Sequence, residues 1–310
     1  MERIERAAVL GAGVIGASWT ALFLAAGVRV AVYDPAPGAQ DGVRRMIDAA
    51  WPVLETLGLT ARGDPAGFAW HDEPAAAVAE AQFVQESVPE RLETKHTLYR
   101  RIERALPAGA VVASSASGLT LTEMQGGWQD PSRFVLGHPF NPPHLIPLVE
   151  VMGNDRTAPG VVDRAEAVYG QLGKVTIRLN REVPGHVANR LQAALWREAI
   201  HLVLEGVASV EDVDKAVWAG PGLRWAAMGP NMLFHLAAGP GGLPEFCARY
   251  GPSFERWWAD LGAPAMNDAT AATLSAGVDA AAGGRAQDDL SAHRDALILA
   301  MLQATCGKRR

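Results

Sequence analysis

Short apolar runs of strand length recur through the first part of the chain, and helix-like stretches separate the earlier ones. Strands that alternate with helices are typical of crossover connections, so this order predicts a doubly wound, mostly parallel sheet. Pro147 lacks a backbone donor, so its strand is expected to lie at an edge or to begin near that residue. The runs are Ala7–Leu10, Val28–Tyr33, Gln82–Val88, Ala110–Ser114, Arg133–Gly137, Pro147–Val151 and Val175–Leu179.

The pattern changes in the second part of the chain, where apolar residues recur at helical spacing with almost no alternation. Pro184 and Gly185 mark the start of the first helix, and Gly220–Gly222 interrupts the run. We therefore expect an α/β domain over residues 1–182 and an all-α C-terminal domain over residues 183–310. The predicted helices are Ala188–Glu205, Val210–Ala219 and Asp289–Ala304, and the predicted loops are Gly239–Gly242 and Ala280–Gly284.

A glycine-rich turn joins the first apolar run to the first helix, with Gly11, Gly13 and Gly16 in the spacing GxGxxG. Gly11 permits the tight turn, Gly13 lets the backbone approach a pyrophosphate, and Gly16 lets the helix pack close to the sheet. Val14 and Ile15 open that helix, where unpaired N–H groups and the helix dipole favour a phosphate. The alternative is an ordinary connection between a strand and a helix, because such glycine turns are common.

Asp34 strengthens the dinucleotide interpretation, because it ends the second apolar run eighteen residues past Gly16. A carboxylate at this position accepts hydrogen bonds from ribose hydroxyls and repels a 2′-phosphate. The next four residues supply no arginine for such a phosphate, although Arg44 and Arg45 lie further along and could reach back. The first domain is therefore predicted to be a Rossmann-type domain that binds NAD rather than NADP.

Composition and charge exclude several other classes of protein. With 310 residues, 49% of them hydrophobic and 20% charged, the chain can bury a core large enough for two domains. It shows no secretory signal and no apolar run of membrane-spanning length, so a cytoplasmic location without a membrane partner is expected. A net charge of −6 argues against a nucleic acid partner, and Lys308–Arg310 is interpreted as a solvated tail. Cys247 and Cys306 are too few for a disulfide framework or a cysteine-rich metal site, so both are interpreted as reduced thiols. A zinc site would need histidine and carboxylate ligands, and no metal site is predicted.

The strongest candidate for chemistry is His138, which directly follows the apolar run Arg133–Gly137. In open α/β sheets ligands bind beyond the carboxyl ends of the strands, which is where this histidine is expected to lie. Glu150 stands twelve residues later in another apolar run, where a carboxylate is costly unless it has a partner. We expect the carboxylate to orient the imidazole, which would then take a proton from a hydroxyl while hydride leaves the same carbon.

Two neutral residues complete this hypothesis. Ser117 follows the strand expected at Ala110–Ser114, and Asn189 lies early in the first helix of the second domain. Each could donate a hydrogen bond to a substrate oxygen that passes between alcohol and carbonyl. The alternatives are a turn or helix cap for Ser117 and a solvent-facing or capping amide for Asn189.

Five segments together resemble the 3-hydroxyacyl-CoA dehydrogenase superfamily over nearly the whole chain, and their order and spacing agree as well as their letters. They are GAGVIG, ESVPERLETK, SSASGLT, HPFNPPHLIPLVEV and PGHVANRLQAALWREA. The resemblance implies that His138 is the general base, that Glu150 is its partner, and that Ser117 and Asn189 contact substrate.

The same resemblance implies further features of the protein. It suggests that Glu90 and Lys95 lie beside the nicotinamide ribose and the bound cofactor. Without it, these two charges would be interpreted as a solvated helix face. Because the family usually pairs through its helical domain, a homodimer through that domain is also expected.

Within the superfamily, the segment Gly220–Pro230 is similar to the branch that contains carnitine 3-dehydrogenase and L-gulonate 3-dehydrogenase, the latter also known as lambda-crystallin. These enzymes oxidise small free 3-hydroxy acids. Arg224 would then clamp the substrate carboxylate in two places, the alternative being a surface or interdomain salt bridge. Trp196 and Trp225, with Phe234, could attract a quaternary ammonium group, although tryptophans at helical spacing are more often core residues.

The sequence is compatible with three functions. The favoured one is an NAD-dependent dehydrogenase of a small 3-hydroxy acid, gulonate-like or carnitine-like. The second keeps the same chemistry on a short-chain 3-hydroxyacyl-CoA. The third is a non-catalytic protein that keeps the dinucleotide site, as a lens crystallin does.

Overall fold

The computed structural model describes residues 3–305. Cys306 and the basic end Lys308–Arg310 therefore lie outside the described residues, whereas Cys247 is exposed and forms no disulfide. The chain divides into two compact units. The first contains the described residues up to Ala188 together with Ile298–Gln303, and the second contains Asn189–Leu297 and the described residues from Ala304 on.

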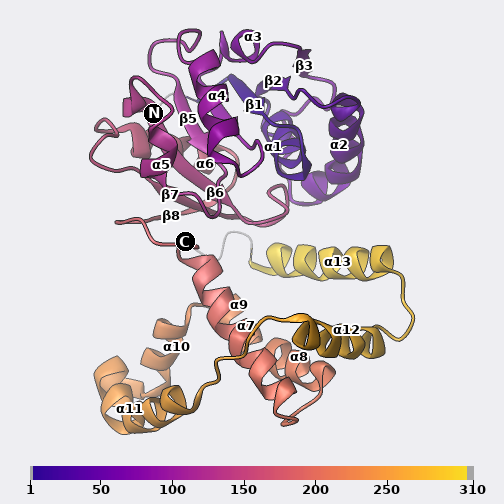
Figure 1. Cartoon of the computed structure of the whole chain (residues 1–310), viewed down its shortest axis with the longest axis vertical. Coiled ribbons are helices and arrows are strands. Elements are labelled where there is room, and N and C mark those ends of the chain that lie inside the picture. Colours follow the sequence, from indigo (N-terminus) through magenta and orange to yellow (C-terminus); the bar gives the residue numbers. More distant parts are fainter. Residues whose placement is uncertain (1–2, 306–310) are drawn as a thin grey trace. The chain divides into compact units, whose positions relative to one another are not determined.

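The first unit is built on one sheet of eight strands in the order β3-β2-β1-β4-β5-β6-β7-β8 (Figure 1). Strands β1 to β6 run parallel, β7 is antiparallel to β6, and β8 is parallel to β7. The predicted doubly wound, mostly parallel sheet is therefore confirmed. The strands are β1 (Arg6–Leu10), β2 (Arg29–Tyr33), β3 (Phe68–His71), β4 (Phe83–Glu86), β5 (Val111–Ser114), β6 (Phe134–Pro139), β7 (Leu148–Met152) and β8 (Val175–Arg178).

Pro147 lies directly before β7, a strand that has neighbours on both sides. Of the two positions expected for this proline, the beginning of a strand is the one observed. The sequence analysis missed β3, a strand of four residues at the sheet edge. Its apolar run, Phe68–Trp70, is only three residues long, which is shorter than the runs that signal a strand.

Helices cover both faces of this sheet (Figure 1). In β1, Ala7 and Val9 pack into one apolar cluster, and Ala8 and Leu10 pack into the other, because successive side chains point to opposite faces. Helices α1, α2 and α6 supply the first cluster, and α3, α4 and α5 supply the second. Their bounds are α1 (Val14–Ala25), α2 (Ala39–Thr56), α3 (Pro74–Val78), α4 (Leu92–Ile102), α5 (Leu121–Gln125) and α6 (Val161–Gln171).

The helices that follow the sheet bury little of their apolar surface within one chain. Helices α9, α10 and α13 contain no buried residue, and α7 contains one, Ile200. Among residues 3–305, no helix combines the length and the apolarity that a membrane crossing requires. The helices are α7 (Ala188–Leu204), α8 (Val210–Ala219), α9 (Pro221–Ala227), α10 (Pro230–Ala237), α11 (Gly242–Asp260), α12 (Asp268–Ala282) and α13 (Gln287–Thr305).

The three predicted helices correspond to α7, α8 and α13. The predicted break at Gly220–Gly222 corresponds to the boundary between α8 and α9. The two predicted loops need correction. Helix α12 continues through Ala282 and ends at Gly283, whose φ of 60° is the left-handed conformation that terminates helices. Gly239–Gly241 forms a single 3₁₀ turn, and Gly242 already belongs to α11.

Candidate active site

The glycine-rich turn lies between β1 and α1, at the carboxyl edge of the sheet. Gly11 has a φ of 91°, and a Cβ atom on Gly16 would overlap the Gly11 carbonyl oxygen. A Cβ atom on Gly13 would have no heavy atom within 4 Å, so the space beside that residue is open to a ligand. No side chain caps the amino end of α1. Open backbone N–H groups and unfilled space are what a dinucleotide pyrophosphate needs.

Asp34 directly follows β2 and ties the end of that strand to the glycine turn. Its Oδ2 accepts a hydrogen bond from the Ala12 amide at 2.6 Å, and its Oδ1 accepts one from the Ala36 amide at 2.8 Å. A carboxylate can accept about four hydrogen bonds, so both oxygens keep capacity for ribose hydroxyls.

Asp34 lines a cavity of about 720 Å³. Arg44 and Arg45 are exposed and do not line this cavity. One cation of this cavity was not expected from the sequence. Arg101 lines it, with its guanidinium bound to Glu73 at 2.7 Å. The remaining lining residues are Gly13, Tyr33, Pro35, Ala36, Ser87, Val88, Pro89, Glu93, Thr94, Thr97 and Leu98.

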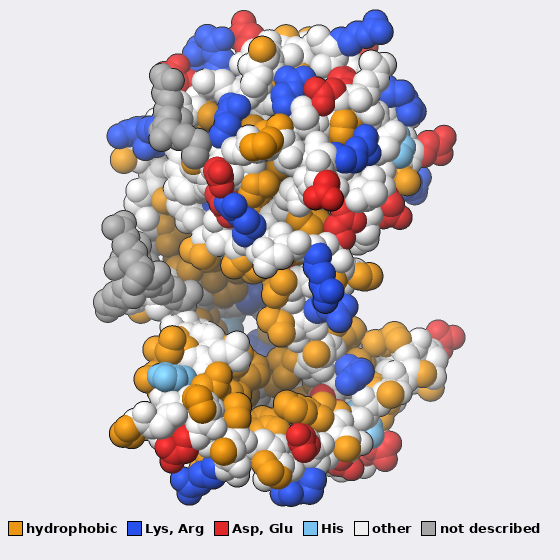
Figure 2. Space-filling view, turned by 90° about the vertical axis from the view of Figure 1, so that its left-hand side faces the viewer, with side chains coloured by type: hydrophobic (Ala, Val, Ile, Leu, Met, Phe, Trp, Pro, Cys, Tyr) orange, Lys and Arg blue, Asp and Glu red, His pale blue; other side chains and the backbone are white. Residues whose placement is uncertain are grey.

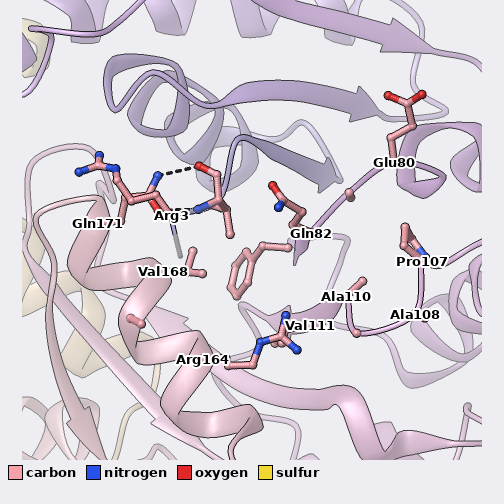
Figure 3. A pocket seen from close by; sticks show the side chains of 15 residues that line it. Arg3, Glu80, Gln82, Pro107, Ala108, Ala110, Val111, Arg164, Val168 and Gln171 are labelled. Atoms are coloured by element: carbon pink, nitrogen blue, oxygen red, sulfur yellow. Dashed lines mark hydrogen bonds between the residues drawn. The ribbon is translucent and has the colours of Figure 1, made fainter. Parts of the chain in front are cut away.

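Another cavity, of about 540 Å³, opens at the amino ends of the parallel strands (Figure 3). The amino ends of β4 and β5 line it through Phe83 and Val111, and Arg164 of α6 lies beside them. At one end the Gln171 carboxamide exchanges hydrogen bonds with the backbone of Ile4. Ligands of open α/β sheets bind at the carboxyl ends of the strands, so the Asp34 cavity is the candidate cofactor site.

His138 and Glu150 stand directly opposite each other on the antiparallel pair β6 and β7. Their side chains meet, with 2.8 Å between Nδ1 of the imidazole and Oε2 of the carboxylate. Because a carboxylate only accepts hydrogen bonds, Nδ1 carries the hydrogen, and in the neutral form of the ring the lone pair is then on Nε2. This is the arrangement that a proton-accepting imidazole requires.

Glu150 is 0% exposed and has three donors. Besides His138, the amides of Val187 and Ala188 donate to its Oε1 at 2.9 and 3.0 Å. Burial raises the pKa of the Glu150 carboxyl, but these hydrogen bonds outweigh burial and lower the pKa below its usual value. The acid beside the imidazole is therefore ionised at neutral pH.

Ser117 lies in the turn after β5 and contacts Glu90. Its hydroxyl donates to Oε2 of Glu90 at 2.8 Å, and the amides of Ser117, Gly118 and Leu119 all donate to Oε1. Burial raises the pKa of Glu90, but the hydrogen bonds outweigh it and lower the pKa. The two residues thus form one polar unit at the carboxyl edge of the sheet.

Lys95 occupies a different environment from the one its spacing suggested. It is 1% exposed, and its Nζ lies 2.6 Å from Oε1 of Glu86. Tyr99 and Ser114 donate to the other oxygen of Glu86 at 2.7 Å each. The interpretation of Lys95 as part of a solvated helix face is therefore wrong, because its charge is paired inside the protein.

The remaining predicted site residues belong to the helical unit. Asn189 lies in the first turn of α7, and Arg224 is an exposed residue of α9. Trp196 is 55% exposed and Trp225 is 39% exposed, so neither is a core residue of the chain. Phe234 instead stacks on Phe246, with 4.6 Å between the ring centroids.

Sequence reasoning missed two buried polar residues, one beside the candidate base and one beneath the loop that follows β6. His186 is buried with its ring centroid 5.1 Å from that of His138. Lys174 donates to the carbonyls of Pro143 and Ile146 in the loop after β6, and burial lowers the pKa of this lysine to about 7. The first has a sequence signal, because it lies within the recognised segment PGHVANRL, whereas the lysine stands in an unremarkable turn.

Comparison with known proteins identifies the family. Residues 6–183 match the model of the 3-hydroxyacyl-CoA dehydrogenase NAD-binding domain, and residues 185–270 match the model of its C-terminal domain. The chain belongs to the 3-hydroxyacyl-CoA dehydrogenase family. It is therefore an NAD-dependent oxidoreductase that acts on a CH–OH group.

Several similar proteins are named L-carnitine dehydrogenase. The one from Streptomyces coelicolor is 49% identical over 304 residues, which cover 98% of this chain and 96% of that protein. The one from Burkholderia mallei is 43% identical, with 97% and 94% covered. Among solved structures, the 5-dehydrogenase of 5-formyl-3-hydroxy-2-methylpyridine 4-carboxylic acid, an NAD⁺-dependent dismutase, has a TM-score of 0.84 at 30% identity. The match covers 98% of this chain and 99% of that one. FadB2 of Mycobacterium tuberculosis has a TM-score of 0.65 at 29% identity, with 82% and 89% covered.

The glycine turn generates a first prediction. Gly13→Ala is expected to keep the thermal midpoint of the wild type, because its new methyl group meets open space, but to weaken NAD binding at least tenfold, about 1.4 kcal/mol. Gly16→Ala is expected to destabilise the fold by about 1–3 kcal/mol, because its methyl group overlaps backbone. Thermal unfolding and titration calorimetry with NAD check both, and equal effects of the two substitutions would contradict this assignment.

A second prediction concerns pH. A carboxyl whose pKa is lowered by folding stabilises the protein above its unfolded pKa of about 4.5, and this stability is lost as pH falls through the lowered value. Glu150→Gln should therefore cost about 1–3 kcal/mol at pH 7, and the difference from wild type should shrink below pH 4.5. Denaturant unfolding at several pH values measures it, with the exposed Glu205→Gln as control. A difference that stays constant down to pH 3 contradicts the prediction.

Proposed function

We propose that the protein oxidises the 3-hydroxyl group of a small free 3-hydroxy acid to the 3-keto acid, with L-carnitine favoured over L-gulonate. The observation that carries this proposal is the similarity, at 40–50% identity over nearly the whole chain, to proteins named L-carnitine dehydrogenase. The ionised, buried Glu150 beside His138 supports the chemistry. The alternative is a short-chain 3-hydroxyacyl-CoA substrate, in line with the family name.

In this mechanism NAD, when bound, supplies the acceptor for the hydride. His138 takes the hydroxyl proton at Nε2 as the C–H electron pair leaves the same carbon. Its Nδ1–H stays on Glu150, whose negative charge stabilises the imidazolium that forms. Ser117 and Asn189 are proposed to hydrogen-bond the substrate oxygen. Both side chains are neutral and stay neutral while the oxygen passes between alcohol and carbonyl.

Cofactor contacts are proposed for three groups of residues. Gly11, Gly13 and Gly16 with the first amides of α1 would hold the pyrophosphate, and Asp34 would hold the adenosine ribose. Glu90 is proposed to face the nicotinamide ribose, and Lys95 is proposed to support the same part of the cofactor site from beneath the surface. Lys95 is buried on Glu86, so its contribution there would be to hold the carboxyl end of β4 rather than to extend into solvent.

The helical unit would select the substrate. We propose that Arg224 binds the carboxylate of a free acid, a group that a coenzyme A thioester lacks at that position. Trp196 and Trp225 have exposed ring faces, which a quaternary ammonium group would contact through cation–π attraction. Carnitine carries both groups, whereas gulonate carries only the carboxylate and needs polar partners for its other hydroxyls.

We further propose that the protein is a homodimer through residues 183–310, which we take as the helical domain that follows residues 1–182. Large apolar side chains gather on the surface of this unit (Figure 2). Exposed apolar surface on this scale is typical of an interface. These exposed side chains include Leu191, Trp196, Trp218, Leu223, Met232, Leu236, Trp257, Trp258 and Val278.

The substrate proposal predicts an order of kcat/KM values. L-Carnitine should exceed both L-gulonate and 3-hydroxybutyryl-CoA, and Arg224→Ala should lower kcat/KM for free acids at least tenfold with little effect on the thioester. A matched control is 3-hydroxy-5,5-dimethylhexanoate, in which a neutral carbon replaces the ammonium nitrogen. Its kcat/KM should be lower than that of L-carnitine by about fivefold or more, because the missing cation–π attraction is worth roughly 1 kcal/mol. NADH formation is the measurement, and turnover of thioesters alone would refute the proposal.

The dimer proposal predicts twice the chain mass by light scattering and a thermal midpoint that rises with protein concentration, because association stabilises the folded chain by mass action. Trp218→Glu tests the apolar face, and Glu255→Gln on the same unit serves as a matched surface control. A monomer with a concentration-independent midpoint would exclude the dimer.

A further inference from the structure

His186 has an unusual backbone conformation. Among residues 3–305, positive φ angles belong to glycines and to His186, whose φ is 50°. Histidine tolerates this left-handed region better than bulkier residues, but the conformation still costs on the order of 1 kcal/mol. The turn that contains it leads into α7, and the next two amides donate to Glu150. The backbone here is therefore fixed by contacts of the candidate active site.

The His186 side chain is 3% exposed and has one nitrogen without a partner. Its Nε2 lies 3.3 Å from the carbonyl oxygen of Ala116, and a carbonyl only accepts, so Nε2 carries the hydrogen. Nδ1 has no hydrogen-bond partner within the described part of the chain. A buried acceptor left unpaired costs about 1–3 kcal/mol, so this atom is a candidate for ligand contact.

Burial lowers the pKa of His186, and the nearby imidazole of His138 lowers it further, although the Ala116 carbonyl and the carboxylates of Glu150 and Glu90 oppose both effects. The net direction is downward, so His186 is neutral at physiological pH. A neutral imidazole with its hydrogen on Nε2 presents a bare lone pair at Nδ1. The ligand atom that pairs with it must therefore be a hydrogen-bond donor.

The ligands of the proposed reaction offer few donors near the reacting carbon, since the hydroxyls of the nicotinamide ribose are proposed to face Glu90. A carboxylate and a quaternary ammonium group have none, and the single proton of the substrate hydroxyl goes to His138. NAD carries an amino group on its carboxamide, which is bonded to the ring carbon next to the one that accepts hydride. This amino group is the donor that remains near the reacting carbon.

We propose that His186 binds the cofactor by accepting, at Nδ1, a hydrogen bond from the carboxamide amino group of the nicotinamide. The contact would fix the rotation of the carboxamide and, through it, which face of the ring meets the substrate. The proposal rests on the proposed role of His138 in placing the reaction beside it. It does not depend on which 3-hydroxy acid is the substrate.

The test compares NAD with 3-acetylpyridine adenine dinucleotide, in which a methyl group replaces the amino group. Dissociation constants are measured by titration calorimetry without substrate, so failure of the substrate proposal does not affect the result. His186→Phe keeps a ring but removes the acceptor, and His186→Asn keeps an acceptor near Nδ1 and tolerates the left-handed backbone. His186→Gly also accepts this backbone and serves if the phenylalanine variant fails to fold.

We expect His186→Phe or His186→Gly to weaken NAD binding about five- to tenfold and to leave binding of the acetylpyridine analogue within about twofold of wild type. His186→Asn should retain most of the preference for NAD. Equal losses for both dinucleotides would overturn the proposal in favour of a structural role. Unchanged dinucleotide binding with a raised KM for the hydroxy acid would overturn it in favour of a substrate contact.

Discussion

The candidate active site depends on keeping one carboxylate charged inside the sheet. Glu150 lies on β7 with no exposed surface, and a lone charge in such a place would be strongly destabilising. Three donors prevent this, one from the facing strand and two from the backbone that leads into α7. The same acid thus orients the imidazole of His138 and fixes the chain where the helical segment begins.

The reversal of strand direction at β7 makes this arrangement possible. Six parallel strands bring their carboxyl ends to one edge, where the glycine turn and Asp34 lie. An antiparallel seventh strand then sets one of its own residues opposite His138 in the hydrogen-bonding register. Residues twelve apart in sequence become direct neighbours through the ladder, so no flexible loop has to hold the pair together.

Most of the fold could be predicted from the sequence, because apolar runs and helical spacing follow directly from which side chains are buried. The edge strand β3 could not, since its apolar run, Phe68–Trp70, is too short to signal a strand. His138 and Glu150 could be paired because a carboxylate within an apolar run demands a partner. The burial of Lys95 could not be predicted, since a lysine on a polar helix gives no sign that it forms a buried ion pair with Glu86. The unpaired nitrogen of His186 is likewise visible only in three dimensions, because it results from the neighbours that the fold provides.

Asp34 limits how the nucleotide preference of this protein can be redesigned. Admitting a phosphorylated ribose requires removal of the negative charge, but the same side chain is the acceptor for the Ala12 amide within the glycine turn. A truncation to alanine would leave that amide unpaired and loosen the turn that is proposed to hold the diphosphate. An engineered variant would therefore have to remove the charge while keeping an oxygen acceptor for the Ala12 amide, as asparagine can at the expense of the Ala36 hydrogen bond, and add a cation separately.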